Sequence, residues 1–242
     1  DLESARSVRK ECDELAPGAA ALEVDVADPA SVRRMFEGFR SRFDRLDVLV
    51  NNAGIGIYGA RAEEYNDVAA KQAVELASTG TIRTHSDSTL KLSDEEWDRM
   101  LRIHLYGTFY CSREALKIMV SQTGDLSAGK IVNMASIMGT AGGAGAVDYC
   151  AAKAGILGFT RALAREVVTR KIQVNAIAPG FIETPLVESL APVHDLIRAQ
   201  TPQGRMGAPD DVAWAAVYLA SPESDFLTGQ VVSPNGGWHM SQ

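Results

Sequence analysis

The sequence predicts an α/β fold in which helices cover both faces of a mostly parallel sheet. Helix-like segments alternate with short apolar runs along the chain, which is the order expected of repeated strand–helix units. The runs DVLV (47–50) and KIVNM (130–134) lack the alternating polar face of half-exposed strands, so we expect both to be covered on two sides. These observations favour a doubly wound parallel sheet.

Start and stop signals set the bounds of the predicted elements. Asp28 can cap a helix that has Pro29 at its first position. Ser93 and Glu96 form a capping box that opens the longest helix. The predicted helices cover residues 1–18, 28–43, 61–78, 93–121, 147–168 and 210–221. The predicted strands cover residues 19–26, 45–54, 129–136, 172–180 and 229–237.

Composition restricts the functional class. The 242 residues carry a net charge of -7 and no block of basic side chains, which argues against nucleic acid or a membrane surface as a partner. No apolar run approaches the roughly 18 residues that span a bilayer. The three cysteines and four histidines are too scattered for a disulfide framework or a metal site. We therefore expect a cytoplasmic protein, one domain over residues 1–242, that acts on a small molecule.

A tyrosine and a lysine lie one helical turn apart in the stretch DYCAAKAG (148–155). Residues four apart share a helix face, so Tyr149 and Lys153 should point the same way. A phenol with its usual pKa near 10 is a poor acid–base catalyst at neutral pH, and a neighbouring ammonium lowers that pKa. Ser136 ends a predicted strand and could hydrogen-bond an oxygen held by the tyrosine. The pair alone fits an ordinary helix surface; with the serine it indicates a general acid–base site.

Four motifs, in this order, resemble the single-domain branch of the short-chain dehydrogenase/reductase family. They are NNAG (51–54), Ser136 followed by YCAAK (149–153), NAIAPGFIETP (175–185) and TGQVVSPNGG (228–237). The resemblance covers almost the whole chain and implies a Rossmann-like dinucleotide-binding domain. It also implies an NAD(P)-dependent oxidoreductase that moves a hydride between a nicotinamide and a secondary alcohol or its ketone.

The resemblance assigns roles to individual residues. Tyr149 would transfer the proton, Lys153 would hold the nicotinamide ribose and lower the tyrosine pKa, and Ser136 would orient the substrate oxygen. His104 stands where the family usually has a catalytic asparagine. Its imidazole either anchors a proton-relay water or is a helix residue without a catalytic role. The other implied cofactor contacts are Asp25, Val26, Asn51, Ala53, Gly54, Pro179, Gly180, Ile182 and Thr184.

The start of the sequence departs from the family pattern. The first strand and the glycine-rich phosphate loop have no counterpart there, and we expect the natural protein to carry roughly 35 to 40 further residues. An acid at the end of the second strand would bind a ribose diol and favour NAD over NADP. Asp1 is a candidate for that acid, although as a helix N-cap it would lie just past the strand. NAD is the expected cofactor and NADP the alternative.

Residues 60–92 form a predicted insertion before the long helix. We expect a solvated surface excursion, and a contribution to the substrate cleft or to a neighbouring subunit is the alternative. Its helix would turn Val68, Ala69, Val74 and Ala77 inward. Further along, the apolar residues of segment 185–209 form either a pocket wall or ordinary helix packing; they are Leu186, Val187, Leu190 and Ile197.

Several functions stay open at this point. The leading one is a reductase or dehydrogenase of a secondary alcohol or ketone, with a 3-oxoacyl thioester or a polyol as candidate substrates. A dinucleotide-binding scaffold or regulator with impaired catalysis is the alternative. An epimerase or dehydratase would need a longer substrate domain than this chain has room for. The resemblance further implies a homo-oligomer, a dimer or a homotetramer, formed through the helices at 94–121 and 149–170 and the last strand.

Overall fold

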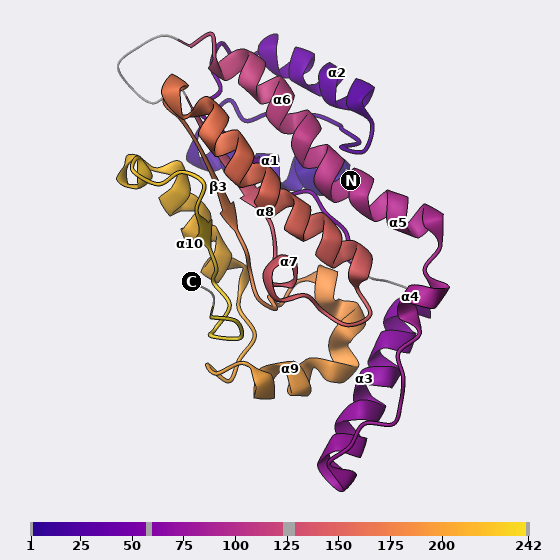
Figure 1. Ribbon diagram of the computed structural model, residues 1–242. Helices are drawn as coiled ribbons and strands as arrows, with labels where there is room; N and C mark the ends of the chain where they lie inside the picture. Colours follow the sequence, from indigo (N-terminus) through magenta and orange to yellow (C-terminus); the bar gives the residue numbers. More distant parts are fainter. Residues whose placement is uncertain (1, 57–59, 123–128, 241–242) are drawn as a thin grey trace.

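The chain folds around a parallel sheet in the computed structural model, which describes residues 2–56, 60–122 and 129–240 (Figure 1). Within these residues the sheet has four strands, and their order in space follows their order in the sequence. The strands are β1 (Val48–Asn51), β2 (Gly129–Met134), β3 (Ile172–Ile177) and β4 (Val231–Val232). Every neighbouring pair is parallel, which confirms the predicted fold class. Asp1 lies outside the described residues.

The helices that the sequence predicts begin and end close to their predicted positions, and the structure adds short helices that were not predicted. The first half of the chain holds α1 (Leu2–Leu15), α2 (Pro29–Arg40), α3 (Ala60–Thr79), α4 (Ser88–Lys91), α5 (Asp94–Leu101) and α6 (Gly107–Met119). The second half holds α7 (Met138–Ala141), α8 (Val147–Val167), η3 (Pro185–Val193), α9 (His194–Gln200) and α10 (Pro209–Ala220). The helix predicted over 93–121 is interrupted by a π-helical turn, η1 (Arg102–Tyr106), between α5 and α6.

The predicted capping signals are confirmed. The Asp28 carboxylate accepts hydrogen bonds from the backbone N–H groups of Ala30 and Ser31. The side chains of Ser93 and Glu96 each accept from the other's backbone N–H at the start of α5. Both caps satisfy donors that the first helical turn leaves without partners, so they fix where these helices begin.

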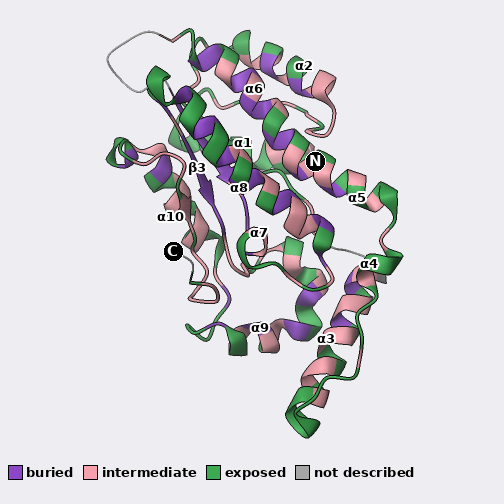
Figure 2. Ribbon diagram, viewed as in Figure 1, coloured by how far each residue is buried: buried purple, intermediate pink, exposed green. Residues whose placement is uncertain are grey.

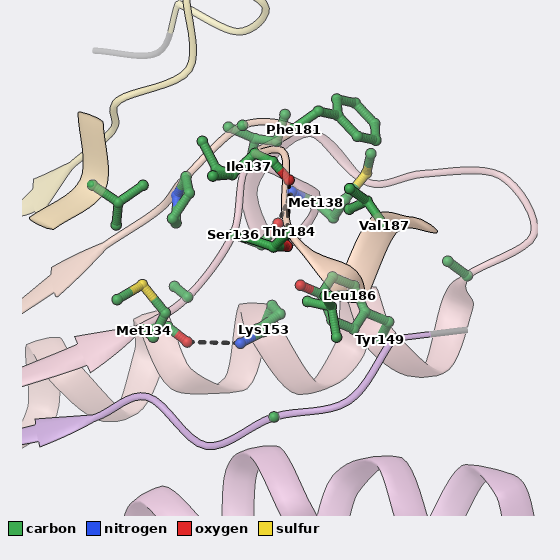
Figure 3. A pocket seen from close by; sticks show the side chains of 18 of the residues that line it. Met134, Ser136, Ile137, Met138, Tyr149, Lys153, Phe181, Thr184, Leu186 and Val187 are labelled. Atoms are coloured by element: carbon green, nitrogen blue, oxygen red, sulfur yellow. Dashed lines mark hydrogen bonds between the residues drawn. The ribbon is translucent and has the colours of Figure 1, made fainter. Parts of the chain in front are cut away.

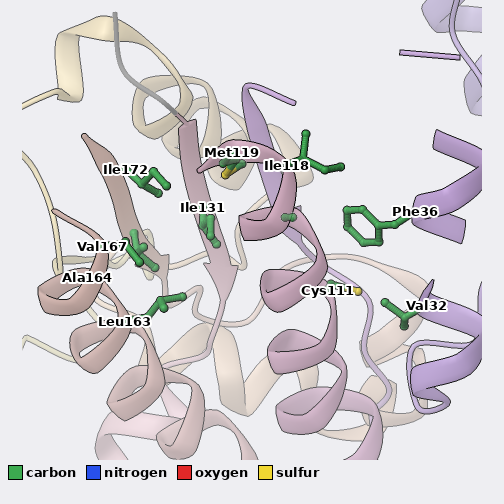
Figure 4. Close-up of a cluster of buried hydrophobic side chains, with 12 residues drawn as sticks. Val32, Phe36, Cys111, Ile118, Met119, Ile131, Leu163, Ala164, Val167 and Ile172 are labelled. Carbon is green, nitrogen blue, oxygen red and sulfur yellow. The ribbon is translucent and has the colours of Figure 1, made fainter. Parts of the chain in front are cut away.

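Each central strand contributes to two hydrophobic layers, because successive side chains point to opposite faces of the sheet. On one face, Ile131 and Val174 pack with side chains of α2, α6 and α8 (Figure 4). On the other face, Val132 and Ile177 pack against Leu219 of α10. β3 is accordingly buried along most of its length (Figure 2). Burial on both faces is the reason that these strands lack polar alternation in the sequence.

The prediction of a strand at 19–26 is wrong, and the other strands are shorter than predicted. Residues 19–25 form no strand, because a parallel strand exists only beside a neighbour that shares its hydrogen bonds, and none of the described strands pairs with this segment. Val24 and Val26 instead pack against the cluster that contains α2 and α6. The last strand shrinks to Val231 and Val232, the two residues that pair with β3.

The inserted helix α3 confirms the helix predicted at 61–78, but its two halves lie in different environments. Ala62 and Asn66 are buried near its start. Val74, further along, is 67% exposed, and Ala77 is exposed as well, so the prediction that these two face inward is wrong. The expected solvated excursion therefore describes only the second half of the helix.

Candidate active site

The main cavity lies beyond the carboxyl ends of the strands, where doubly wound sheets bind ligands (Figure 3). Its volume is about 690 Å³, within the usual range for small-molecule sites. The loop after β1, the loop after β2, the first turns of α8 and the segment after β3 all contribute to its wall. Predicted site residues that line it are Gly54, His104, Ser136, Tyr149, Lys153, Pro179, Gly180, Ile182 and Thr184.

Helix α8 places Tyr149 and Lys153 one turn apart, as the sequence predicts. Lys153 is 4% exposed, its Nζ donates a hydrogen bond to the Met134 carbonyl at 2.7 Å, and it lies 5.5 Å from the centre of the Tyr149 ring. Burial lowers the pKa of Lys153 to about 8, because the charged form loses its hydration. The ammonium is still the main form at pH 7.

The expected lowering of the tyrosine pKa is wrong for this structure. Burial raises the pKa of Tyr149 above its ordinary value, since a phenolate would be poorly solvated in the cavity wall. A hydrogen bond with Ser136 acts in the opposite direction but is the smaller effect. The phenol is therefore protonated at neutral pH and can give a proton to a bound oxygen.

Ser136 is held beside the tyrosine by the end of β2. The backbone N–H of Ala135 donates to Ile177 of β3 at 2.7 Å, which keeps the strand paired up to this point. The Ser136 hydroxyl accepts a hydrogen bond from the Met138 backbone N–H at 3.1 Å, and the side chain is 7% exposed. Its O–H can thus donate into the cavity while its position is fixed by the backbone.

His104 lies in the π-helical turn η1, a kind of irregularity that is frequent at functional sites. Its Nε2 lies 2.9 Å from the Ile55 carbonyl oxygen, and its ring meets the Tyr149 ring edge-on, with 5.4 Å between centres. Burial and the charge of Lys153 lower the pKa of His104 to about 4, so the imidazole is neutral at pH 7. Among the described residues its buried Nδ1 has no hydrogen-bonding partner.

Gly54 is required for this arrangement. A Cβ atom on Gly54 would lie 2.5 Å from Cε1 of His104, closer than real contacts allow. The glycine of NNAG therefore makes room for the imidazole as well as for a ligand. The sequence alone suggested only the second reason.

Four predicted cofactor residues lie away from the described cavity wall. Asp25 accepts a hydrogen bond from the Ala27 backbone N–H at 2.9 Å and caps its own turn. Val26 packs on Gly107 of α6. The Asn51 amide donates to Asn133 at 2.8 Å and to the Ser112 hydroxyl at 3.0 Å, so it joins a polar network across the sheet. Ala53 is exposed.

The sequence indicated a contribution of the insertion to the cleft only as the alternative, and of the apolar wall it indicated Leu186, Val187 and Leu190. Tyr65 of α3 lines the cavity, and Arg61 of the same helix binds the buried Asp148 beside Tyr149. No local sequence pattern indicates these contacts, because the partners are distant along the chain: Arg61 and Asp148 are 87 positions apart. The apolar lining includes Met134, Met138, Phe181, Leu186, Val187, Leu190 and Val212. Ile197, also considered for the wall, packs instead in the cluster beneath it.

The described residues show two further negative findings. No group of His, Cys, Asp and Glu side chains in 2–56, 60–122 and 129–240 is arranged to hold a metal ion. No helix in these ranges is long and apolar enough to cross a membrane.

Comparisons with known proteins agree with this geometry. A family profile described as short chain dehydrogenase matches residues 1–88, and one described as enoyl-(acyl carrier protein) reductase matches residues 76–239. The 3-oxoacyl-[acyl-carrier-protein] reductase FabG of Salmonella typhimurium is 34% identical over 229 residues, covering 94% of this chain and 81% of that protein. The FabG of Thermotoga maritima is 33% identical over 236 residues, covering 97% and 83%.

A solved structure extends the comparison to three dimensions. A short-chain type dehydrogenase/reductase from Mycobacterium marinum superposes with a TM-score of 0.81 at 28% identity, covering 100% of this chain and 84% of that one. Sequence profiles, relatives and fold agree with one another and with the residues that converge in the cavity. The chain belongs to the short-chain dehydrogenase/reductase family of NAD(P)-dependent oxidoreductases.

Proposed function

We propose that the chain reduces a ketone with an apolar substituent to a secondary alcohol, and catalyses the reverse oxidation, with Tyr149 as the general acid–base. One observation carries the proposal. The Tyr149 phenol, the Lys153 ammonium and the Ser136 hydroxyl converge on a single cavity at the carboxyl edge of the sheet. Separately each residue is ordinary, but together they supply a proton, a positive charge and a hydrogen-bond donor for one oxygen atom.

The donors in the cavity fit the nicotinamide half of a dinucleotide. Lys153 has three N–H groups and uses one on the Met134 carbonyl, which leaves donors for ribose hydroxyls. Pro179, Gly180, Ile182 and Thr184 line the same cavity, in the position proposed for the carboxamide. The stretch GTAGGAG (139–145) has the glycine spacing of a phosphate loop, but it follows β2 and lies next to α8. The cavity residues therefore support binding of the nicotinamide end of the cofactor only. The contacts of Asp25 and Val26 with the adenine end stay predictions.

The chain's residues have complementary roles in the reduction. Ser136 and Tyr149 donate hydrogen bonds to the substrate carbonyl oxygen and so polarise the carbonyl. A reduced nicotinamide held in the cavity would supply the hydride that adds to the carbonyl carbon. Tyr149, protonated at neutral pH because of its burial, gives its proton to the oxygen, which completes the alcohol. The Lys153 ammonium stabilises the phenolate that remains.

His104 is proposed as the residue that brings the next proton to Tyr149. Its neutral ring lies edge-on to the phenol, and its unpartnered Nδ1 can accept a hydrogen bond from a water. The backbone of Ile55 fixes the ring through Nε2, which lies 2.9 Å from the carbonyl oxygen and 3.1 Å from the backbone nitrogen; Nδ1 is an acceptor in the tautomer in which Nε2 donates to the carbonyl. This arrangement supports the proton-relay reading of His104 over that of a helix residue without a role.

The apolar wall favours an acyl chain over a polyol. A polyol carries a hydroxyl group on each carbon and would leave several of them without partners against Met138, Phe181 and Leu186. A 3-oxoacyl thioester has one reacting carbonyl and an apolar chain that such side chains can cover. The names of the relatives, which are 3-oxoacyl-[acyl-carrier-protein] reductases, support the same class.

Three finer expectations stay predictions: the preference for NAD over NADP, the homo-oligomeric state and the cytoplasmic location. Likewise, the single domain over residues 1–242 with an insertion at 60–92 is part of the proposal. None of the proposed steps depends on any of these expectations.

The direct test follows the absorbance of NADH and NADPH with 3-oxobutanoyl-coenzyme A and ethyl 3-oxobutanoate, and that of NAD and NADP with sorbitol. We expect oxidation of one reduced cofactor with the 3-oxo compounds and little reaction with sorbitol. Quenching of protein fluorescence by the cofactors without any turnover would instead support the scaffold or regulator.

A further inference from the structure

The inserted helix α3 is attached to both walls of the cavity. At its start, the Arg61 guanidinium donates two hydrogen bonds to the Asp148 carboxylate of α8, each at 3.0 Å. One turn later, the Asn66 amide donates to the Ser189 carbonyl of η3 at 2.6 Å. Asp148 is fully buried and precedes Tyr149, and Ser189 itself lines the cavity. The first turns of α3 therefore join the catalytic helix to the segment that covers the cavity.

Tyr65 lies between these two attachments, and its ring is held from two sides. On one side it packs against the cluster formed by Leu190, Val193, Ile197 and Met206. On the other side it reaches the backbone of Gly145, where a Cβ atom would lie 2.8 Å from Cδ2 of the ring. Gly145 has a φ of 81°, which also disfavours any other residue there.

The environment of α3 changes abruptly beyond this point. Tyr65 and Asn66 are half-buried or buried, whereas Val74 and Leu76 are 67% and 55% exposed. The contact with the cavity is therefore confined to the first half of the helix, and Figure 1 shows the second half extending away from the sheet. A substitution of Tyr65 in the first half can therefore be compared with a control substitution of Val74 in the second half of the same helix.

We propose that Tyr65 determines substrate specificity: its ring closes one end of the cavity and limits the size of the group attached to the reacting carbonyl carbon. The proposal rests on the ketone reduction proposed above. Arg61 and Asn66 fix the helix backbone at both walls, and the packing against Gly145 and the Leu190 cluster restricts rotation of the ring. Ring size, not the phenolic hydroxyl, sets the limit.

The test compares two ketones that differ only in this group, ethyl 3-oxobutanoate and ethyl 3-oxo-3-phenylpropanoate. Values of kcat/KM and calorimetric Kd are measured for the wild type, Tyr65→Ala, Tyr65→Phe and the control Val74→Ala. In Tyr65→Ala we expect the preference to move toward the phenyl ketone by about tenfold or more, as for other changes of pocket size. Tyr65→Phe and Val74→Ala should keep the wild-type preference.

The outcomes separate this proposal from the proposed reaction. An unchanged preference in Tyr65→Ala, with both ketones turned over, overturns the role of Tyr65 and leaves the reaction intact. Binding of the ketones without turnover overturns the reaction, while the ratio of the two Kd values still reports on Tyr65. A preference that moves equally in Tyr65→Phe would contradict the claim that ring size is decisive. Tyr65→Phe also guards against misfolding, because it keeps the packing against Leu190 and Gly145.

Discussion

Replacing Arg61 by methionine removes the positive charge from a buried ion pair while keeping an apolar stem of similar length. In the native fold the Asp148 side chain is 0% exposed, and both of its oxygens accept hydrogen bonds from the guanidinium. In the described part of the chain, no other side chain lies within bonding distance of this carboxylate. Breaking one side of a buried pair costs about 3 to 5 kcal/mol, because the remaining charge is left without a partner.

For a chain of this length, such a loss lowers Tm by roughly 6 to 20 °C. Thermal unfolding followed by circular dichroism measures it directly. The matched control is Arg9→Met, since Arg9 and Asp13 form an exposed pair whose loss should cost at most about 1 kcal/mol. Adding Asp148→Asn to Arg61→Met removes the buried charge and should restore part of the Tm. Equal shifts for Arg61→Met and Arg9→Met would refute the reasoning.

Two further predictions concern the buried titratable groups of the cavity. The pKa of His104 is about 4 in the fold against an ordinary 6.5, so only the unfolded chain binds that proton as the pH falls through this window. The free energy of unfolding should therefore decrease by about 3 kcal/mol from pH 6.5 to 4, and His104→Asn should remove this slope while keeping activity within an order of magnitude. Denaturant titrations at several pH values measure this dependence, with His85→Asn, a change at an exposed histidine, as the control. If the free energy of unfolding depended on pH equally in both variants, the prediction would be contradicted. Lys153→Met should abolish turnover without lowering Tm. The variant loses the hydrogen bond to Met134, but it also removes a buried charge whose unfavourable burial lowers the pKa of Lys153 to about 8, and the two effects offset each other. A large fall in Tm, compared with that of the surface variant Lys71→Met, would show that the ammonium stabilises the fold.

Local signals in the sequence were sufficient for most of the fold. The cap at Asp28 and the capping box at Ser93 act within four residues, so they could be read directly, and strand β2, which ends two residues before Ser136, was marked by its apolar run. The strand predicted at 19–26 failed because β structure depends on a partner elsewhere in the chain. The β propensity of a segment depends on its own residues, whereas strand pairing depends on the other strands of the sheet.

In the candidate site, too, the local arrangements could be predicted from the sequence and the long-range contacts could not. Spacing on one helix placed Tyr149 and Lys153 together, and strand ends placed Ser136 and Gly54 near them. The sign of the tyrosine pKa shift could not be predicted, because it depends on how deeply the phenol is buried. Arg61 and Tyr65 were missed since their partners are distant in sequence and only packing brings them together.

The measurement that tests the central claim most directly is the turnover number of Tyr149→Phe with a 3-oxoacyl substrate, set against its affinity for NADPH or NADH. The phenylalanine keeps the ring against His104 but has no proton to give. We predict a loss of kcat of about 10² to 10⁴-fold, the usual contribution of a general acid, with cofactor affinity changed by less than about threefold. A variant that turns over substrate as fast as the wild type would contradict the account.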